Sequence, residues 1–240
     1  MSNINDQLKP PSSIKVIVFD FDNCLVLDEK TKTGSEEIKD QAWFEIFSEY
    51  DRKELEAVLD QAKKIVVGGA GDRNDIAQQI LRHFNHPEAT LAASAIKKCD
   101  LFNQYVQKRI GEVIITPATR KTLSELASQY PLYINTATPR DAALESLKIL
   151  NLISFFKEVF GRPGTKVDNL QKIIAAESVN PMQVLFIDDQ PGGWDAAQTV
   201  GCIFAGIYTA KNKLWQNEKQ PFPLVNSLTE LPALLLKINY

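Results

Sequence analysis

The stretch VIVFDFDNCLVLDE, residues 16–29, decides how the rest of this chain is interpreted. The apolar run from Ile14 to Phe19 is continuous and rich in β-branched residues, which is typical of a strand covered on both faces. It runs directly into Asp20 and Asp22. Because an isolated carboxylate is costly to bury, this pair predicts either strong partners or a chemical role.

Similar apolar runs recur along the chain, separated by segments with helical spacing. The further runs are PLYIN (131–135), EVFG (158–161), QVLFI (183–187) and CIFAGI (202–207), and the helical segments are 116–130, 139–150, 166–177, 193–201 and a closing helix within 227–238. Thr116 is the expected N-cap of the first of these helices, with Pro117 at its first position. Strands that alternate with helices predict an α/β fold, a Rossmann-like core built on a parallel sheet.

One section interrupts this alternation. Residues 28–112 contain amphipathic helical patterns and no convincing strand, which predicts an all-helical cap domain inserted after the first strand. The expected organisation is a flexible polar tail (1–13), an α/β core (14–27 and 113–240) and the cap (28–112).

Composition excludes several classes of protein. The 240 residues carry 27 Lys and Arg against 30 Asp and Glu, a net charge of −3 that offers no general field for nucleic acid or an anionic membrane. No apolar run approaches the roughly 18 residues of a membrane span. The three cysteines, Cys24, Cys99 and Cys202, are widely spaced and indicate neither disulfides nor zinc. We therefore expect a cytoplasmic protein.

Polar residues follow the predicted strands. Asp20 and Asp22 follow the first, the sequence Asn-Thr-Ala-Thr (135–138) follows the second, and Asp188 and Asp189 follow QVLFI. The carboxyl ends of parallel strands meet at one edge of a sheet, where ligands bind. Lys166, at the start of a predicted helix, could reach the same edge.

Charge predicts what this edge binds. Four carboxylates against one lysine favour a hard divalent cation, and Mg²⁺ together with a substrate phosphate fits oxygen ligands best. Asp20 would then attack phosphorus, and Asp22 would protonate the leaving oxygen and later deprotonate water. Thr136 and Lys166 would hold the phosphoryl oxygens. Taken singly, each residue could be a turn, a cap or a solvated side chain; their combination in this order favours the functional interpretation.

These residues resemble the four motifs of the haloacid dehalogenase (HAD) superfamily, in particular its β-phosphoglucomutase and phosphatase-like branch with a C1-type helical cap. The motifs are VIVFDFDNC (16–24), LYINTATPR (132–140), GRPGTK (161–166) and VLFIDDQPGGWDAAQTVGC (184–202). The resemblance implies a Mg²⁺-dependent enzyme. In it Asp20 is the nucleophile and Asp22 the acid/base, and the phosphate-binding residues are Thr136, Ala137 and Lys166. The residues of the metal site are Asp20, Asp22 (through its backbone carbonyl), Asp189 as a direct ligand, and Asp188, which either binds the metal or lies next to a residue that does.

The chain departs from the family pattern at two positions. Cys24 stands where Thr is usual, and Gly193 replaces the later aspartate of the commoner fourth motif. Within the predicted cap, the segment GGAGDRND (68–75) resembles a specificity loop in which Arg73 meets the substrate. Alternatively, Arg73 is a solvated residue at a helix start, where Asp72 or Asn74 is the cap.

The sequence thus predicts a phosphomonoesterase that acts on a small phosphorylated metabolite through an aspartyl-phosphate. Two alternatives remain open: a phosphomutase of the β-phosphoglucomutase type, which uses the same pair of aspartates, and a non-catalytic binding protein with this fold. The expected partner is a small phosphate ester, with no nucleic acid and no membrane. No pattern indicates an oligomeric state.

Overall fold

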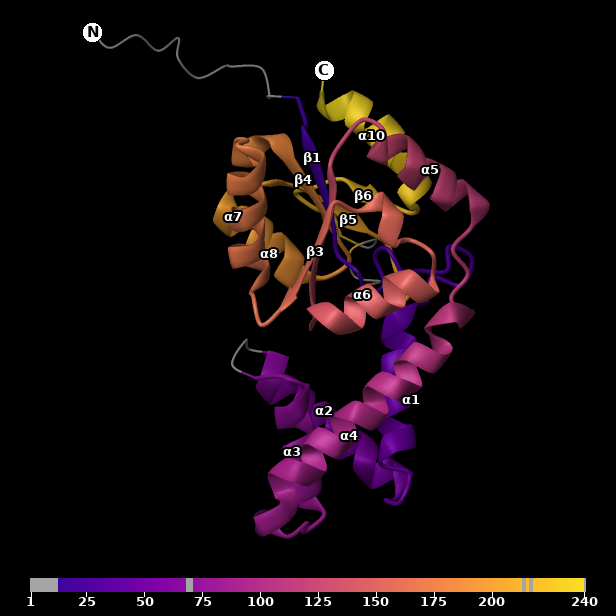
Figure 1. Cartoon of the computed structure of the whole chain (residues 1–240), viewed down its shortest axis with the longest axis vertical. Helices are drawn as coiled ribbons and strands as arrows, with labels where there is room; N and C mark the ends of the chain where they lie inside the picture. Colours follow the sequence, from indigo (N-terminus) through magenta and orange to yellow (C-terminus); the bar gives the residue numbers. More distant parts are fainter. Residues whose placement is uncertain (1–12, 68–70, 213–214, 216–217, 240) are drawn as a thin grey trace, which may run out of the picture. The chain divides into compact units, whose positions relative to one another are not determined.

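A computed structural model describes residues 13–67, 71–212, 215 and 218–239. It contains a six-stranded, fully parallel sheet (Figure 1). The strand order is β3-β2-β1-β4-β5-β6. The strands are β1 (Val16–Phe19), β2 (Leu132–Pro139), β3 (Glu158–Arg162), β4 (Val184–Asp188), β5 (Ile203–Ile207) and β6 (Leu224–Val225). The predicted α/β fold is confirmed. The edge strand β6 was not predicted, because two residues are too few to make a pattern.

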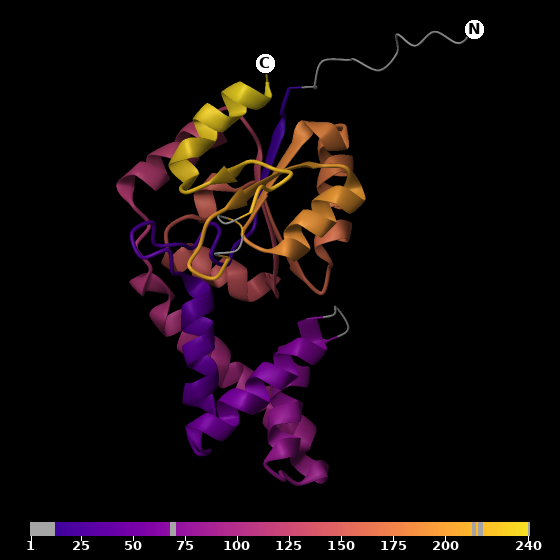
Figure 2. The ribbon, with the colours of Figure 1, turned by 180° about the vertical axis from the view of Figure 1, so that it is seen from behind.

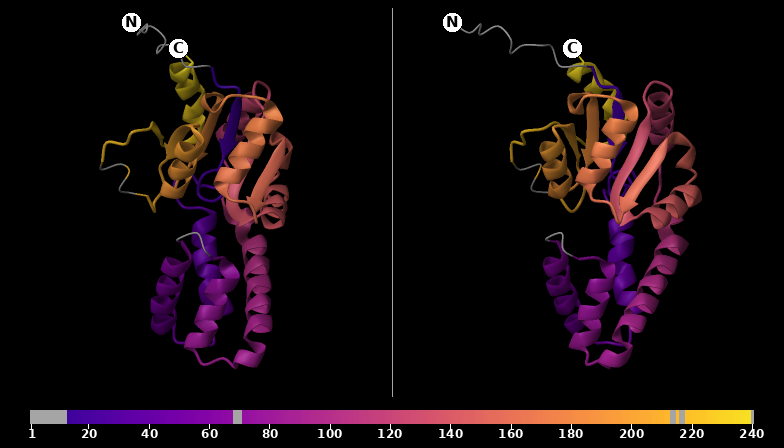
Figure 3. Two further views of the ribbon diagram at one scale, coloured as in Figure 1. Left: turned by 90° about the vertical axis from the view of Figure 1, so that its left-hand side faces the viewer. Right: turned by 60° about the vertical axis from the view of Figure 1, so that its left-hand side comes forward.

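Helices cover both faces of the sheet (Figures 1 and 2). Side chains that alternate along the strands, such as Val16 and Val18, pack with α7 (Lys166–Glu177) and α8 (Pro191–Val200). On the opposite face lie α5 (Pro117–Ala127), α6 (Arg140–Ile149) and α10 (Leu231–Ile238), so that the sheet is the middle of three layers (Figure 3). Strands buried on both faces explain the unbroken apolar runs.

The helix boundaries follow local sequence signals. Thr116 is the N-cap of α5 and accepts a hydrogen bond from the Thr119 amide, with Pro117 in the first turn as predicted. Pro232 likewise lies in the first turn of α10. Proline is tolerated there because amide groups of the first turn have no partner within the helix.

The chain divides into two compact units. Unit 1 contains the sheet and comprises the chain up to Ser35 and from Gly111 onward; unit 2 is Glu36–Ile110. Residues 28–35, which the sequence analysis assigned to the insertion, thus cluster with the sheet. They form a tight hairpin in which the Asp28 amide donates to the Thr33 carbonyl, and the Ala210 amide donates to the carbonyl of Lys32 at 2.8 Å.

Unit 2 is helical throughout its described residues. Its helices are α1, which begins at the boundary (Ser35–Ile46), α2 (Arg52–Val67), α3 (Arg73–His83) and α4 (Glu88–Arg109). Aromatic side chains pack together in this unit: the buried rings of Trp43 and Phe102 lie 4.9 Å apart, and the half-buried ring of Tyr50 stacks on Phe84. Among the described helices, none is long and apolar enough to cross a membrane.

Two predictions fall on residues outside the described ranges. The expected tail, 1–13, lies there except for its last residue, and so do Gly68 and Gly69 of the predicted specificity loop.

Candidate active site

Sheet register aligns three polar residues at the carboxyl end of the central strands. Phe19, the last residue of β1, is level with Ile134 of β2 and Ile187 of β4. The next residue in each chain segment is therefore Asp20, Asn135 or Asp188. The Asp20 amide continues the ladder by donating to the Ile187 carbonyl at 2.8 Å.

Lys166 joins this row from the first position of α7. Its ammonium lies 2.9 Å from Oδ1 of Asp20 and also donates to Oδ2 of Asp188. The side chain is only 17% exposed, whereas a solitary lysine at a helix start is usually solvated. The structure therefore brings together three of the residues that the sequence analysis proposed.

Two buried amides hold the start of α7 against β2. Nδ2 of Asn135 donates to the Lys166 carbonyl at 2.9 Å, and Nδ2 of Asn169 donates to Oδ1 of Asn135 at 3.0 Å. These contacts fix the backbone from which the lysine side chain extends. The sequence analysis placed Asn135 at the end of a strand, but these contacts were not predicted, because the pairing of Asn135 with Asn169 and with the Lys166 carbonyl depends on how α7 packs.

The site contains more carboxylates than cations. Burial raises the pKa of Asp20 to about 8, with the carboxylates of Asp188 and Asp22 adding to the effect and Lys166 opposing it. Burial disfavours the charged form of Lys166, but Asp188 and Asp20 outweigh this and raise the pKa of its ammonium. The single ammonium of Lys166 therefore does not offset the effect of burial on Asp20.

A divalent cation fits this imbalance. Asp20, Asp188 and Asp189 are buried and each offers an oxygen within 4.8 Å of the others, close to twice a metal–oxygen bond of about 2.0–2.5 Å. An all-oxygen set suits Mg²⁺ or Ca²⁺ better than zinc or copper. A bound dication would also lower the pKa of Asp20 into the range where it is ionised. The side chain of Asp22 is not part of this cluster, and the part of its backbone carbonyl in metal binding stays a prediction.

Backbone groups of the segment that follows β4 position the side chain of Asp188. Its Oδ1 accepts a hydrogen bond from the Gln190 amide at 2.9 Å, and its Oδ2 faces Gly193. A Cβ atom at Gly193 would lie 2.1 Å from that oxygen. The glycine that replaces an aspartate of the commoner motif is therefore required here, because the carboxylate of Asp188 occupies the space.

Asp189 is positioned through its main chain. Nδ2 of Asn212 donates to the Asp189 carbonyl at 2.9 Å and to the Ile207 carbonyl at 2.8 Å. Asn212 lies in the loop after β5 and ties this loop to the end of β4. It was not among the predicted site residues, because no motif marks an amide in that loop.

Asp22 has partners of a different kind. Oγ of Ser35 donates to its Oδ1 at 2.7 Å, and Oγ1 of Thr138 donates to its Oδ2 at 2.6 Å. The Thr138 amide in turn donates to Oγ1 of Thr136, the predicted phosphate-binding hydroxyl, which is buried on the same strand. Ala137 lies exposed between the two threonines.

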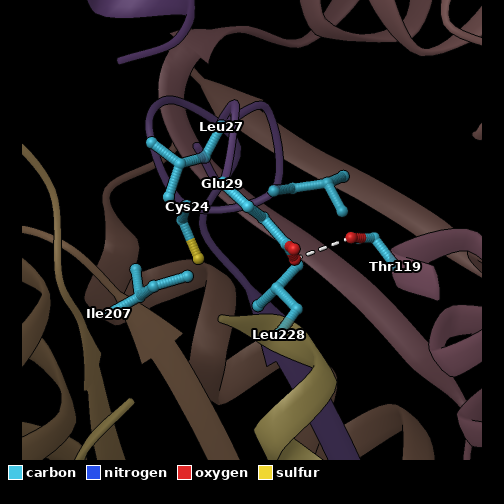
Figure 4. Close-up of a pocket in the computed structure, with 7 residues that line it drawn as sticks. Cys24, Leu27, Glu29, Thr119, Ile207 and Leu228 are labelled. Carbon is cyan, nitrogen blue, oxygen red and sulfur yellow. Dashed lines mark hydrogen bonds between the residues drawn. The ribbon is translucent and has the colours of Figure 1, made fainter. Parts of the chain in front are cut away.

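Cys24 is part of the turn that follows Asp22. Its thiol is fully buried and donates to the Ile187 carbonyl at 3.3 Å, and burial raises its pKa well above the ordinary value. It lines a small pocket that is bounded also by Leu25, Leu27, Glu29, Thr119, Ile207 and Leu228 (Figure 4). The Glu29 carboxylate there accepts hydrogen bonds from Thr119 and Ser227. None of the predicted site residues lines this pocket.

Arg73 belongs to unit 2 and has partners within it. Its guanidinium lies 4.0 Å from the centre of the Phe102 ring and donates to Oδ1 of Asn103. Asp72 is the N-cap of α3, as one of the two interpretations expected, and forms a reciprocal capping box with Asp75. A contact of Arg73 with substrate stays a prediction.

Comparisons with known proteins agree on the fold. Residues 17–207 match the family model of the haloacid dehalogenase-like hydrolases. No protein with a curated description matches the sequence.

Solved structures with a similar fold cover nearly the whole chain. A β-phosphoglucomutase from Clostridium difficile is 18% identical, with a TM-score of 0.65 over 94% of this chain and 97% of that one. A predicted phosphoglycolate phosphatase from Haemophilus somnus 129PT is 18% identical, with a TM-score of 0.64 over 92% and 97%. YfnB from Bacillus subtilis, bound to magnesium, is 16% identical, with a TM-score of 0.65 over 93% and 99%. At these identities the likeness concerns the fold alone.

Proposed function

Because this chain belongs to the haloacid dehalogenase-like hydrolase family, we propose that it is a Mg²⁺-dependent phosphatase acting on a small phosphorylated metabolite. Family membership confirms the resemblance inferred from the four motifs. The observation that carries the proposal is the buried Lys166 ammonium between Asp20 and Asp188, with Asp189 near enough to share a cation with both. A site built this way attracts a phosphate while keeping an anionic nucleophile beside it.

The proposed reaction has two displacements at phosphorus. In the first, an oxygen of Asp20 forms a bond to phosphorus and the ester P–O bond breaks, while Asp22 gives its proton to the leaving oxygen. In the second, Asp22 takes a proton from water, the water oxygen bonds to phosphorus, and the Asp20 carboxylate is released with inorganic phosphate. A bound Mg²⁺ would supply positive charge that offsets the carboxylates and the phosphate.

Charge and donors at the site support the other roles. Lys166 can place positive charge on the phosphoryl oxygens as the bonds to phosphorus rearrange, because its ammonium already lies 2.9 Å from Asp20. The hydroxyl of Thr136 and the amide of Ala137 are the proposed donors to the same oxygens. Ala137 is an exposed residue of β2 at this edge of the sheet, which supports such a role for its amide.

A phosphomutase would use the same pair of aspartates and remains the second candidate. It would need a further cation for a second phosphate, and Arg73 is the residue that the resemblance suggests for it. The stacking of Arg73 on Phe102 and its hydrogen bond to Asn103 would hold the Arg73 guanidinium in a defined orientation.

A phosphatase assay tests the proposal. Wild-type protein with Mg²⁺ should release p-nitrophenol from p-nitrophenyl phosphate, and EDTA should stop the release. Asp20→Asn should abolish turnover while the protein stays folded, because it removes only the nucleophilic charge. Asp195→Asn, which removes the same charge from an exposed position on α8, should behave as wild type.

The outcomes separate the candidates. A panel of phosphate esters that leaves wild type and Asp20→Asn equally inert would favour a binding protein. Turnover that appears only with a sugar bisphosphate as activator would favour the mutase. We propose the cytoplasm as the location, since buried thiols such as Cys24 and Cys202 are compatible with a reducing compartment.

A further inference from the structure

Asp22 is held at both carboxylate oxygens by hydroxyl groups that come from distant parts of the chain. Ser35 lies 13 residues away and Thr138 lies 116 residues away, and their bonds are 2.7 Å and 2.6 Å long. Ser35 is fully buried, and Thr138 and Asp22 are less than a tenth exposed. A donor at each oxygen fixes the direction of the carboxyl group and the rotation of its plane.

The backbones that carry these hydroxyls are themselves fixed. The Ser35 amide donates to the Val26 carbonyl at 3.3 Å, and a Cβ atom at Gly34 would lie only 2.0 Å from that carbonyl oxygen. The hairpin therefore packs tightly against the turn after Asp22. On the other side, the amide of Thr138 is bound to Thr136 at 3.1 Å.

The hydrogen bonds to Asp22 come from hydroxyl groups, whereas Asp20 contacts the ammonium of Lys166. A hydroxyl can donate to a carboxylate or accept from a carboxylic acid, so it can hold the group in either form. An ammonium can only donate and would favour the carboxylate alone.

We propose that Ser35 and Thr138 are positioning residues, which orient the Asp22 carboxyl group for proton transfer to the leaving oxygen. This inference rests on the proposed phosphatase function. It predicts that loss of either hydroxyl harms the transfer of a proton rather than the fold, the metal site or the attack by Asp20.

A comparison of two phosphate esters separates an effect on proton transfer from an effect on the fold, the metal site or the attack by Asp20. Phenyl phosphate has a poor leaving group that needs a proton, and p-nitrophenyl phosphate has a good one that needs it much less. The value of kcat/KM depends only on the steps up to departure of the leaving group. Hydrolysis of the aspartyl-phosphate comes later and is the same for both esters, so it does not affect the comparison.

We expect Ser35→Ala and Thr138→Val to lower kcat/KM for phenyl phosphate by about 10- to 100-fold. The value for p-nitrophenyl phosphate should fall much less, so that the ratio of the two changes by about tenfold or more. Ser35→Thr and Thr138→Ser, which keep the hydroxyl, should restore the ratio. Matched controls are Ser146→Ala in α6 and Thr122→Val in α5, buried hydroxyls of the same unit that should leave the ratio unchanged.

A folded Ser35→Ala or Thr138→Val protein that loses activity equally on both esters would overturn the inference and leave the phosphatase function standing. A wild-type protein inert on both esters and on the wider panel would instead overturn the function itself. If thermal denaturation shows that a variant is unfolded, Ser35→Cys and Thr138→Cys decide in its place. They keep the size of the side chain with only a weak donor, and an unchanged ratio in them also overturns the inference.

Discussion

An alanine at position 193 should damage the site through one misplaced methyl group. A Cβ atom there would lie 2.1 Å from Oδ2 of Asp188, and ordinary contact begins at 3.4 Å. The carboxylate must therefore retreat by at least about 1.3 Å, taken as the difference between these two distances. That same oxygen is the one that Lys166 holds, so the ammonium must follow it or lose the contact.

The expected size of the effect follows from this displacement. Misplacement of about 1 Å at a catalytic site can lower activity about 100-fold, and overpacking costs about 1–3 kcal/mol of stability. We expect Gly193→Ala to lose activity and stability by about these amounts. It should also need a higher Mg²⁺ concentration for half-maximal activity, because Asp188 belongs to the predicted metal cluster.

The neighbouring glycine supplies the matched control. A Cβ atom at Gly192 would meet nothing within 4 Å, although both glycines lie in the same turn of α8. Gly192→Ala should therefore keep full activity and gain up to about 1 kcal/mol, since alanine favours a helix over glycine. The assays are turnover of p-nitrophenyl phosphate over a range of Mg²⁺ concentrations and urea unfolding without metal. Equal activity, metal dependence and stability in the two alanine variants would refute the steric argument.

Three further predictions concern charge and hydrogen bonding at the site. Burial raises the pKa of Asp20 from 3.8 to about 8, so between these values the folded protein keeps a proton that the unfolded chain has lost. The contribution of Asp20 to the stability of the metal-free protein should therefore be largest below this window and be lost as pH rises through it, by at most about 1.4 kcal/mol per pH unit. Urea unfolding at a series of pH values measures this, and a slope that persists unchanged in Asp20→Asn would contradict it. Lys166→Met leaves buried carboxylates without their cation, so we expect a loss of about 3–5 kcal/mol that added Mg²⁺ partly restores in thermal denaturation; wild-type stability in this variant would speak against the charge argument. Asn212→Asp removes the donor to the Asp189 carbonyl at nearly constant size, and we expect a loss of about 1–3 kcal/mol together with weaker Mg²⁺ binding by calorimetry. Unaltered Mg²⁺ affinity would show that this hydrogen bond does not position the metal ligand.

The sheet could be predicted because each central strand is a continuous apolar run. Strands β1 to β5 all lie within or beside predicted segments, and the signal is clearest in β1 and β4, where every residue is buried. Residues 28–35 cluster with the sheet unit, whereas the sequence analysis placed them in the insertion, because a hairpin that bonds to the sheet unit through Lys32 has no local apolar signal of its own.

The candidate site was predictable to the extent that it depends on topology. Parallel strands bring their carboxyl ends together, so Asp20 and Asp188 could be expected at one edge. The partners of Asp22 could not be predicted, because Ser35 and Thr138 are common residues whose meeting depends on tertiary contacts across the chain. Asn212 could not be predicted for the same reason.

The position of β1 between β2 and β4 has a consequence for how the protein is made. Val16 pairs with Val184, which is 168 positions later in the chain. At about 5–20 residues per second, roughly 8–34 s pass during synthesis before that partner exists. Until then an apolar strand has an open edge that can bind other nascent chains. The helices of Glu36–Ile110 form a compact unit of their own, and every residue of that unit is synthesised before Val184, the partner of Val16 in the sheet.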